Sequence, residues 1–214
     1  DAYSAKGLYE RSREVLESYL RNVKENYYIH VGLCINYFVR GKYDLSLAEV
    51  DKMSSIQPSS FINYIARGDN YRDKGDLLAA EKEYQKLLDL EEKVGPYNGR
   101  FMLAALYLME GKYKEAENQI DQGIELAEKI GERSWELSLL SFLEYIAISS
   151  GNPEKALEAC DKACVVASEI DDLAGKRRSL LNKGIAYLAL NSPAEPKKAA
   201  AELKELIEGG PNKK

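Results

Sequence analysis

The sequence predicts an all-α protein in which antiparallel helix pairs stack one after another along the chain. A turn residue recurs at separations of 34, 34, 36, 40 and 40 residues, and the apolar residues on either side of each turn follow the helical period. Only six prolines occur in 214 residues, and the chain is 45% hydrophobic and 30% charged, which suits a folded repeat protein with a large apolar interior. The recurring turn residues are Gly7, Gly41, Gly75, Gly111, Gly151 and Asn191.

The residues around each turn repeat as well. An aromatic residue precedes most turns by four positions, and small residues stand seven positions before and five positions after most of them. These offsets place the small residues on facing sides of two successive helices, where they let the two backbones approach closely. The residues four before the turns are Tyr3, Tyr37, Tyr71, Tyr107, Ala147 and Tyr187. The small residues are Cys34, Gly68, Ala104, Gly184, Ser12, Ser46, Ala80, Ala116 and Ala156, with Glu144 as the exception.

The first segment reads as a partial N-terminal repeat over residues 1–26. Asp1 falls in the second half of a helix that ends at Gly7, and residues 7–20 form a second helix. Because a helix pair cut in this way leaves apolar surface uncovered, we expect the chain to be a piece of a longer protein and predict self-association through this segment. The alternative is that the short helix is its own N-terminal cap. The apolar face of residues 7–20 is predicted to comprise Ser12, Leu16, Tyr19 and Leu20.

The rest of the chain divides into complete repeats over residues 27–60, 61–96, 97–136 and 137–176, a last repeat over 177–208 and a tail over 209–214. In two places the helix after the turn has a clear N-terminal signal, because a capping residue precedes a proline: Asn152–Pro153 and Ser192–Pro193. The last helix, in "KKAAAELKELIEGG", is amphipathic with a polar outer face.

Most repeats show the order small residue, aromatic residue, glycine and small residue at a spacing of about 34, and Pro58 closes "MSSIQP". This pattern resembles the tetratricopeptide repeat (TPR) family over nearly the whole chain. The 40-residue spacing of the later repeats resembles the long-helix variety seen in kinesin light chains and in some bacterial regulators. The resemblance implies an α-solenoid, a right-handed superhelical array of antiparallel helix pairs in which the first helices line a concave groove. It also implies a non-catalytic scaffold that binds other proteins.

The resemblance places the ligand groove on the first-helix face beside the packing stripe. In this chain that face is more apolar than a solvated surface, and a contiguous apolar strip of this kind usually marks a binding site. The cationic and amide residues with which one TPR subclass clamps a terminal carboxylate are absent in combination, since Arg178 and Asn182 stand alone. The predicted groove residues are Tyr28, Val31, Ile35, Phe38, Ile62, Ile65, Asp69, Arg72, Asn98, Phe101, Leu108, Tyr145, Ile148, Leu181, Ile185 and Leu188. The alternative is that tight stacking buries many of them between repeats.

No constellation of residues predicts catalysis, a metal site or a cofactor. The single histidine, His30, falls on a helix-packing position and reads as a core residue. Cys160 and Cys164 lie one helical turn apart, but they and Cys34 occupy inward positions without further ligands nearby. Trp135 follows the Gly131 break and is predicted to pack across that junction. We therefore predict that the chain is not an enzyme.

Charge and hydropathy exclude further classes. The net charge of −5 argues against a nucleic-acid surface, RNA recognition by helical repeats included. The longest apolar run, residues 101–109, is far shorter than the ~20 residues that span a bilayer, so no membrane insertion is expected. An odd count of three cysteines leans towards a reducing compartment, and we expect a cytoplasmic location.

The leading function is therefore a scaffold or regulatory module, of a signalling protein by resemblance, that binds a protein or peptide partner with an apolar segment. The alternative is a small-molecule sensing domain of a bacterial signalling or transcription regulator. Such a domain would need a compact polar pocket, for which only Asp69, Arg72 and Asn98 are candidates.

Overall fold

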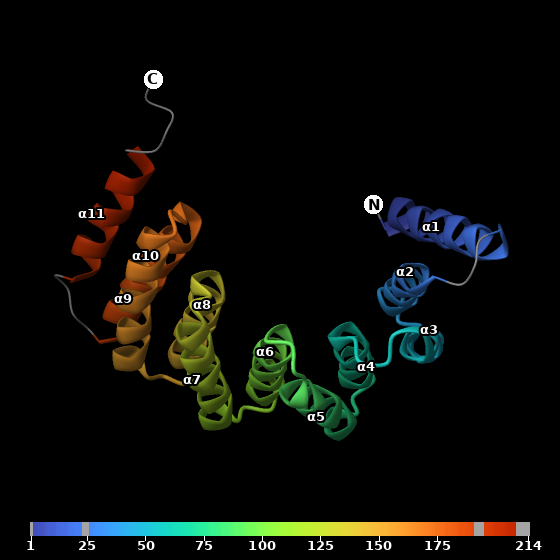
Figure 1. The fold of residues 1–214 in the computed structure, drawn as a ribbon. Coiled ribbons are helices and arrows are strands. Elements are labelled where there is room, and N and C mark those ends of the chain that lie inside the picture. The colour runs from blue at the N-terminus through green and yellow to red at the C-terminus, as the bar shows by residue number, and fades with distance from the viewer. Residues whose placement is uncertain (1, 23–25, 191–194, 209–214) are drawn as a thin grey trace. The chain divides into compact units, whose positions relative to one another are not determined.

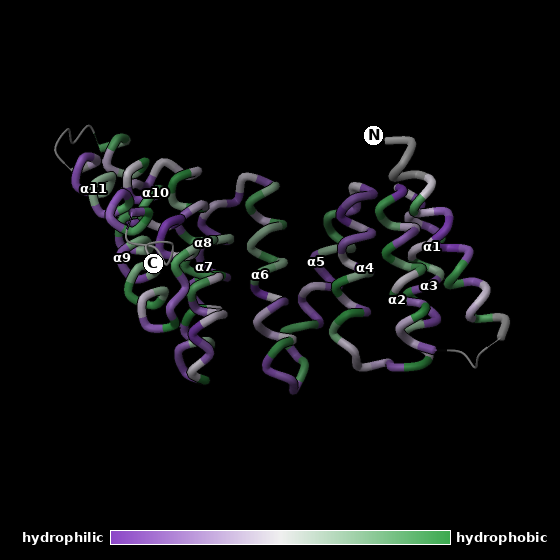
Figure 2. The backbone as a smooth tube through the Cα atoms, turned by 90° about the horizontal axis from the view of Figure 1, so that it is seen from above, coloured by the Kyte–Doolittle hydropathy of each residue, from purple (hydrophilic) through white to green (hydrophobic). Residues whose placement is uncertain are grey.

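A computed structural model describes residues 2–22, 26–190 and 195–208. Eleven α-helices and one short 3-10 helix make up the secondary structure of these residues, and no strand occurs among them (Figure 1). The chain divides into two compact units, residues 1–99 and residues 100–214. Along most helices, hydrophilic and hydrophobic residues alternate at short intervals, as expected for helices with one buried face (Figure 2).

The first unit is built from consecutive helices joined by short turns. The helix α1 packs on α2, which pairs with α3, and α3 packs on α4, which pairs with α5. The helices are α1 (Ala2–Asn22), α2 (Tyr27–Phe38), α3 (Tyr43–Ile56), α4 (Phe61–Asp73), α5 (Leu77–Lys86), the 3-10 helix (Leu87–Asp89) and the start of α6 (Val94–Met109), within which the division falls.

The second unit continues the same plan with longer helices. Four of them have 17 or 18 residues, against 10 to 14 for α2 to α5, which confirms the predicted long-helix repeats. Each helix from α7 to α10 packs on the next one, and α10 also contacts α8. The helices are α7 (Tyr113–Ile130), α8 (Arg133–Ser149), α9 (Pro153–Glu169), α10 (Leu173–Ala189) and α11 (Glu195–Glu208). The first helices α6, α8 and α10 begin ahead of the predicted boundaries at 97, 137 and 177.

Four of the predicted turn glycines end a helix in the left-handed region of φ/ψ space. Their φ angles lie between 67° and 87°, and glycine adopts this conformation without the steric penalty that a Cβ brings. These residues are Gly41, Gly75, Gly111 and Gly151. The predicted turn at Asn191 and the Ser192–Pro193 cap lie outside the described residues. Asn152, which precedes Pro153, caps α9 as predicted, because its side chain accepts a 3.1 Å hydrogen bond from the backbone amide of Lys155.

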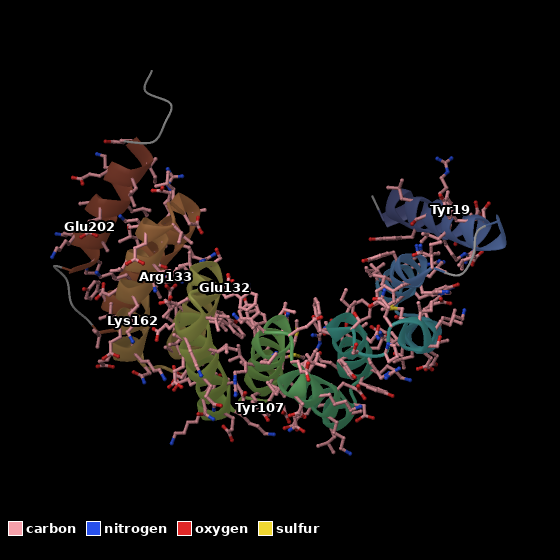
Figure 3. All side chains as sticks on the ribbon, in the orientation of Figure 1. Tyr19, Tyr107, Glu132, Arg133, Lys162 and Glu202 are labelled. Carbon is pink, nitrogen blue, oxygen red and sulfur yellow. The ribbon has the colours of Figure 1, made fainter. Side chains whose placement is uncertain are left out.

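The turn predicted at Gly7 is wrong. Residues 2–22 form one continuous helix through Gly7, so no half-helix and turn precede residues 7–20. A single glycine inside a helix costs about 1 kcal/mol relative to alanine, and the strong helix formers beside it, Ala5, Lys6 and Leu8, offset that cost. The predicted apolar face is also only partly covered, because Leu16 and Leu20 are half-buried whereas Tyr19 is exposed. Figure 3 labels Tyr19 on α1.

Most of the predicted small residues lie where helices touch, but Ser12 is exposed and a Cβ added at Gly184 would meet no atom within 4 Å. A Cβ added at Gly68 in α4 would stand 2.3 Å from the ring of Tyr84 in α5, a separation that no side chain tolerates. In the second unit Ala147, Ala156 and Ala186 form one fully buried cluster. The core of each unit therefore depends on backbones that approach closely, as the sequence predicted.

Glu144 is the exception at a small-residue position, and the structure accommodates it with partners on a neighbouring helix. Its side chain is fully buried and accepts hydrogen bonds from Ser179 Oγ at 2.6 Å and Asn182 Nδ2 at 2.7 Å. Burial of the carboxylate raises the pKa of Glu144 above its ordinary value, although both hydrogen bonds oppose that shift.

Candidate partner-binding surface

The predicted groove residues lie on the first helices α2, α4, α6, α8 and α10, and none of them is buried. Tyr28, Tyr145 and Leu181 are 72%, 57% and 55% exposed, and Leu188 is exposed to a similar extent. Exposed side chains of this size stand out because other large apolar residues on these helices, such as Leu33, Leu106 and Leu143, are buried. The sequence offsets therefore selected residues that are exposed or half-buried.

In the first unit six predicted residues line one pocket between α2 and α4, with a volume of about 210 Å³. The pocket also takes in four residues that the sequence analysis missed, because their offsets placed them on the packing stripe or outside both stripes. The predicted lining residues are Val31, Ile35, Phe38, Ile62, Ile65 and Asp69, and the missed ones are Cys34, Met53, Ala66 and Asn70.

Polar atoms gather where α4 lines this pocket. Asp69 Oδ1 accepts hydrogen bonds from Tyr84 Oη at 2.7 Å and from Arg72 Nη1 at 2.8 Å. Desolvation raises the pKa of the Asp69 carboxyl, while these two hydrogen bonds oppose the rise. The pKa of the Tyr84 hydroxyl is also raised, first by burial and then by the Asp69 charge beside it.

The neighbouring Asn70 is fully buried. Its Nδ2 donates to Ala66 O at 2.7 Å and to Ser46 Oγ at 3.0 Å. Since a carbonyl oxygen only accepts hydrogen bonds, the contact with Ala66 fixes which amide atom is the nitrogen. The other atom, Asn70 Oδ1, is buried without a hydrogen-bond partner.

In the second unit the corresponding face carries a row of aromatic rings. The ring centroids of Phe101 in α6 and Phe142 in α8 lie 4.8 Å apart. The rings of Phe142 and Tyr145 are stacked, with their centroids 6.5 Å apart. Phe142 was not among the predicted residues, because its offset lies next to the selected positions. On α10 three predicted residues, Leu181, Ile185 and Leu188, are exposed. The second unit thus has an apolar strip of its own.

The remaining predicted groove residues are less distinctive. Asn98 bonds to the Val94 carbonyl of its own helix at 2.8 Å, and Arg72 is held by Asp69 and Asp73. Leu108 and Ile148 are half-buried.

The residues weighed as chemical candidates are buried or half-buried. His30 Nδ1 lies 2.7 Å from Glu49 Oε2, and both side chains are buried. Burial raises the pKa of each of the thiols Cys34, Cys160 and Cys164, which disfavours the reactive thiolate. Among the residues that the structure describes, no cluster of three or more His, Cys, Asp or Glu side chains could hold a metal ion, and no helix is long and apolar enough to cross a membrane.

Comparisons with known proteins agree with the helix-pair plan. The tetratricopeptide repeat family model matches residues 63–94, which contain Gly68, Gly75 and Tyr84. Among solved structures, MamA is 20% identical with a TM-score of 0.60, covering 85% of this chain and 92% of MamA. BtubC from P. vanneervenii is 14% identical with a TM-score of 0.70, covering 97% of this chain and 93% of BtubC.

A third solved structure, a signal transduction ATPase with a tetratricopeptide repeat sensor from Pyrococcus horikoshii, is 16% identical with a TM-score of 0.70. The match covers 91% of this chain and 31% of that protein. A comparison with curated proteins gave no sequence relative. The fold and the exposed first-helix faces define a helical repeat protein of the α-solenoid class. Residues 63–94 match the tetratricopeptide repeat family, and the solved structures share the TPR-like fold that the spacing predicted.

Proposed function

We propose that this chain is a non-catalytic interaction module that binds an apolar segment of a partner protein along its first helices. The observation that carries the proposal is the exposure of apolar side chains at the positions where TPR proteins bind ligands, in both units. Exposed contiguous apolar surface costs free energy in water unless another surface covers it. Aromatic residues such as Tyr145 are favoured anchors in protein interfaces.

The apolar character of the pocket in the first unit favours a protein segment over a metabolite. Sites for small molecules usually measure about 300–1,000 Å³ and combine apolar walls with several polar groups. The α2–α4 pocket measures about 210 Å³ and its walls are mostly apolar. The sensing alternative keeps one supporting observation, the similar fold of the repeat sensor in the archaeal ATPase.

The proposal is tested by charge substitutions on the exposed strip of the second unit. The double variant Tyr145→Asp, Leu181→Asp places two carboxylates on this strip without opening a cavity, because both side chains are more than half exposed. The control is Val165→Asp on α9, at 58% exposure, combined with Leu78→Asp on α5. We expect proteins captured from the source cell extract by the parent chain to be retained by the control and lost by the strip variant, as measured by quantitative mass spectrometry.

Circular dichroism of both variants checks that the helices persist. Equal retention of the captured proteins by the two variants would refute the assignment of the binding surface. A ligand that raises the midpoint of thermal unfolding in a metabolite screen, together with no strip-dependent protein, would favour the sensing function instead.

A further inference from the structure

We propose that the α2–α4 pocket receives one bulky apolar side chain of a partner segment and that this segment carries a positively charged hydrogen-bond donor next to that side chain. The inference rests on the proposed function and specifies the kind of segment that the first unit selects. It follows from the size of the pocket, the nature of its walls and the chemistry of its polar end.

The size of the pocket fits a single side chain. An apolar protein cavity of about 150 Å³ binds benzene, so the 210 Å³ between α2 and α4 accommodates one ring or one branched aliphatic group. The walls are Val31, Ile35 and Phe38 from α2 and Ile62 and Ile65 from α4. A matching side chain would remove this apolar surface from water.

The polar end of the pocket is formed by Asp69 and Asn70 of α4, and it offers hydrogen-bond acceptors but no donor that is not already engaged. Both hydrogen bonds to Asp69 end on Oδ1, which leaves Oδ2 to accept another. Asn70 Oδ1 is a second acceptor without a partner. The donors close by are already engaged: Asn70 Nδ2 by Ala66 and Ser46, and the Tyr84 hydroxyl by Asp69.

The charges at this end sum to a negative value. Arg72 is shared between two carboxylates, Asp69 and Asp73, through bonds of 2.8 Å each. Two negative charges and one positive charge leave one negative charge beside the pocket. An anionic group would therefore meet only acceptors and like charge, whereas an ammonium or guanidinium group finds complementary atoms.

Three probes of equal ring size test this chemistry: 2-phenylethylamine, 2-phenylethanol and 3-phenylpropionate, which carry a positive, zero and negative charge at neutral pH. Titrations are followed by methyl NMR, with Val31, Ile35, Ile62 and Ile65 as reporters. We expect millimolar affinities, as is usual for fragments of this size, in the order amine, alcohol, carboxylate. The amine should bind about fivefold more tightly than the alcohol, as expected for one partly exposed charge pair.

Two variants locate the charge preference. Asp69→Asn should bring the amine to the affinity of the alcohol, because it removes both a negative charge and a carboxylate of the lining. Asp73→Asn removes the same charge but leaves the Asp69 carboxylate in the lining, so it should weaken the preference without abolishing it. Ile35→Lys should reverse the preference towards the carboxylate. Because Ile35 is exposed, this substitution leaves the core intact even if Asp69→Asn disturbs the fold.

A peptide pair distinguishes a partner segment from a free small amine. In a short glycine–serine peptide, phenylalanine followed by lysine should shift the same methyl signals, and phenylalanine followed by glutamate should bind several-fold more weakly. Binding of the free amine without binding of the lysine peptide would overturn the partner-segment assignment. Equal or tighter binding of 3-phenylpropionate, or no methyl shift with any probe, would overturn the pocket assignment itself.

The probes report on the pocket whether or not a partner is known. Loss of captured protein in the Tyr145→Asp, Leu181→Asp variant together with silent probes would therefore refute this inference alone. Probe binding in the expected order without any strip-dependent partner would refute the proposed function instead.

Discussion

Ser179 in α10 donates a 2.6 Å hydrogen bond to the carboxylate of Glu144 in α8, and both side chains are fully buried. The bond joins the first helices of successive repeats at a position where other repeats have glycine, alanine or cysteine. Asn182 donates a second bond to the same carboxylate. A buried charge at this place makes the stability of the second unit depend on pH.

Replacing Glu144 with glutamine should remove part of that dependence. Burial raises the pKa of Glu144 in the folded state, so the folded chain binds this proton more tightly than the unfolded chain does. The parent protein is therefore most stable with respect to this group below the ordinary glutamate pKa. Its stability decreases as the pH rises from there through the raised pKa of folded Glu144. Glu144→Gln should lack this contribution.

Urea unfolding at about pH 5 and pH 8 measures the effect. We expect the free energy of unfolding of the parent to fall more between these two pH values than that of Glu144→Gln. Other groups with raised pKa values, including Asp69, contribute equally to both proteins and cancel in the comparison. Parallel pH profiles would contradict the prediction.

Two glycines at equivalent repeat positions should respond in opposite directions to alanine. Gly68→Ala should destabilise the protein by about 1–3 kcal/mol, because the new Cβ would overlap the ring of Tyr84. Gly184→Ala should stabilise it by about 0.5–1 kcal/mol, because a Cβ at Gly184 meets no atom within 4 Å and alanine favours the helix. Thermal unfolding of the two variants tests the pair, and shifts of the same sign would show that the repeats are packed alike.

Helix caps offer a third test. Asn152→Ala should cost about 1 kcal/mol, because the amide of Lys155 loses its acceptor at the start of α9. At the equivalent position before α3, Lys42 makes no side-chain cap, whereas Asp76 caps α5. Lys42→Asp should therefore raise stability by about 0.5–1 kcal/mol. Unchanged melting midpoints for both variants would exclude capping as a source of stability here.

The three thiols should differ in reactivity. Burial raises the pKa of Cys34 and Cys160, and both side chains are almost inaccessible, so a thiol reagent should modify them only through unfolding. Cys164 is half-buried and should be modified first, though more slowly than a free thiol. Mass spectrometry of a time course with a maleimide gives the order, and early modification of Cys160 would contradict it.

Much of the fold could be predicted because it is local. The turn glycines, the small residues and the Asn152 cap each act on neighbours in sequence or on the next helix, so their offsets alone indicate their contacts. Gly7 shows where this reasoning fails. Its offset matched the pattern, but a helix ends only where an alternative conformation is more stable, and the residues around Gly7 continue α1.

The candidate surface divides in the same way. Helical periodicity by itself selected residues of the first helices that are exposed or half-buried, among them Val31, Ile35, Ile62 and Ile65 on the wall of the pocket. Only the tertiary structure decided that Asn70 joins them with an unused acceptor and that Glu144 has partners on α10. Spacing along one helix fixes direction around that helix, whereas the volume between two helices and the pairing of buried polar atoms depend on how closely separate segments pack.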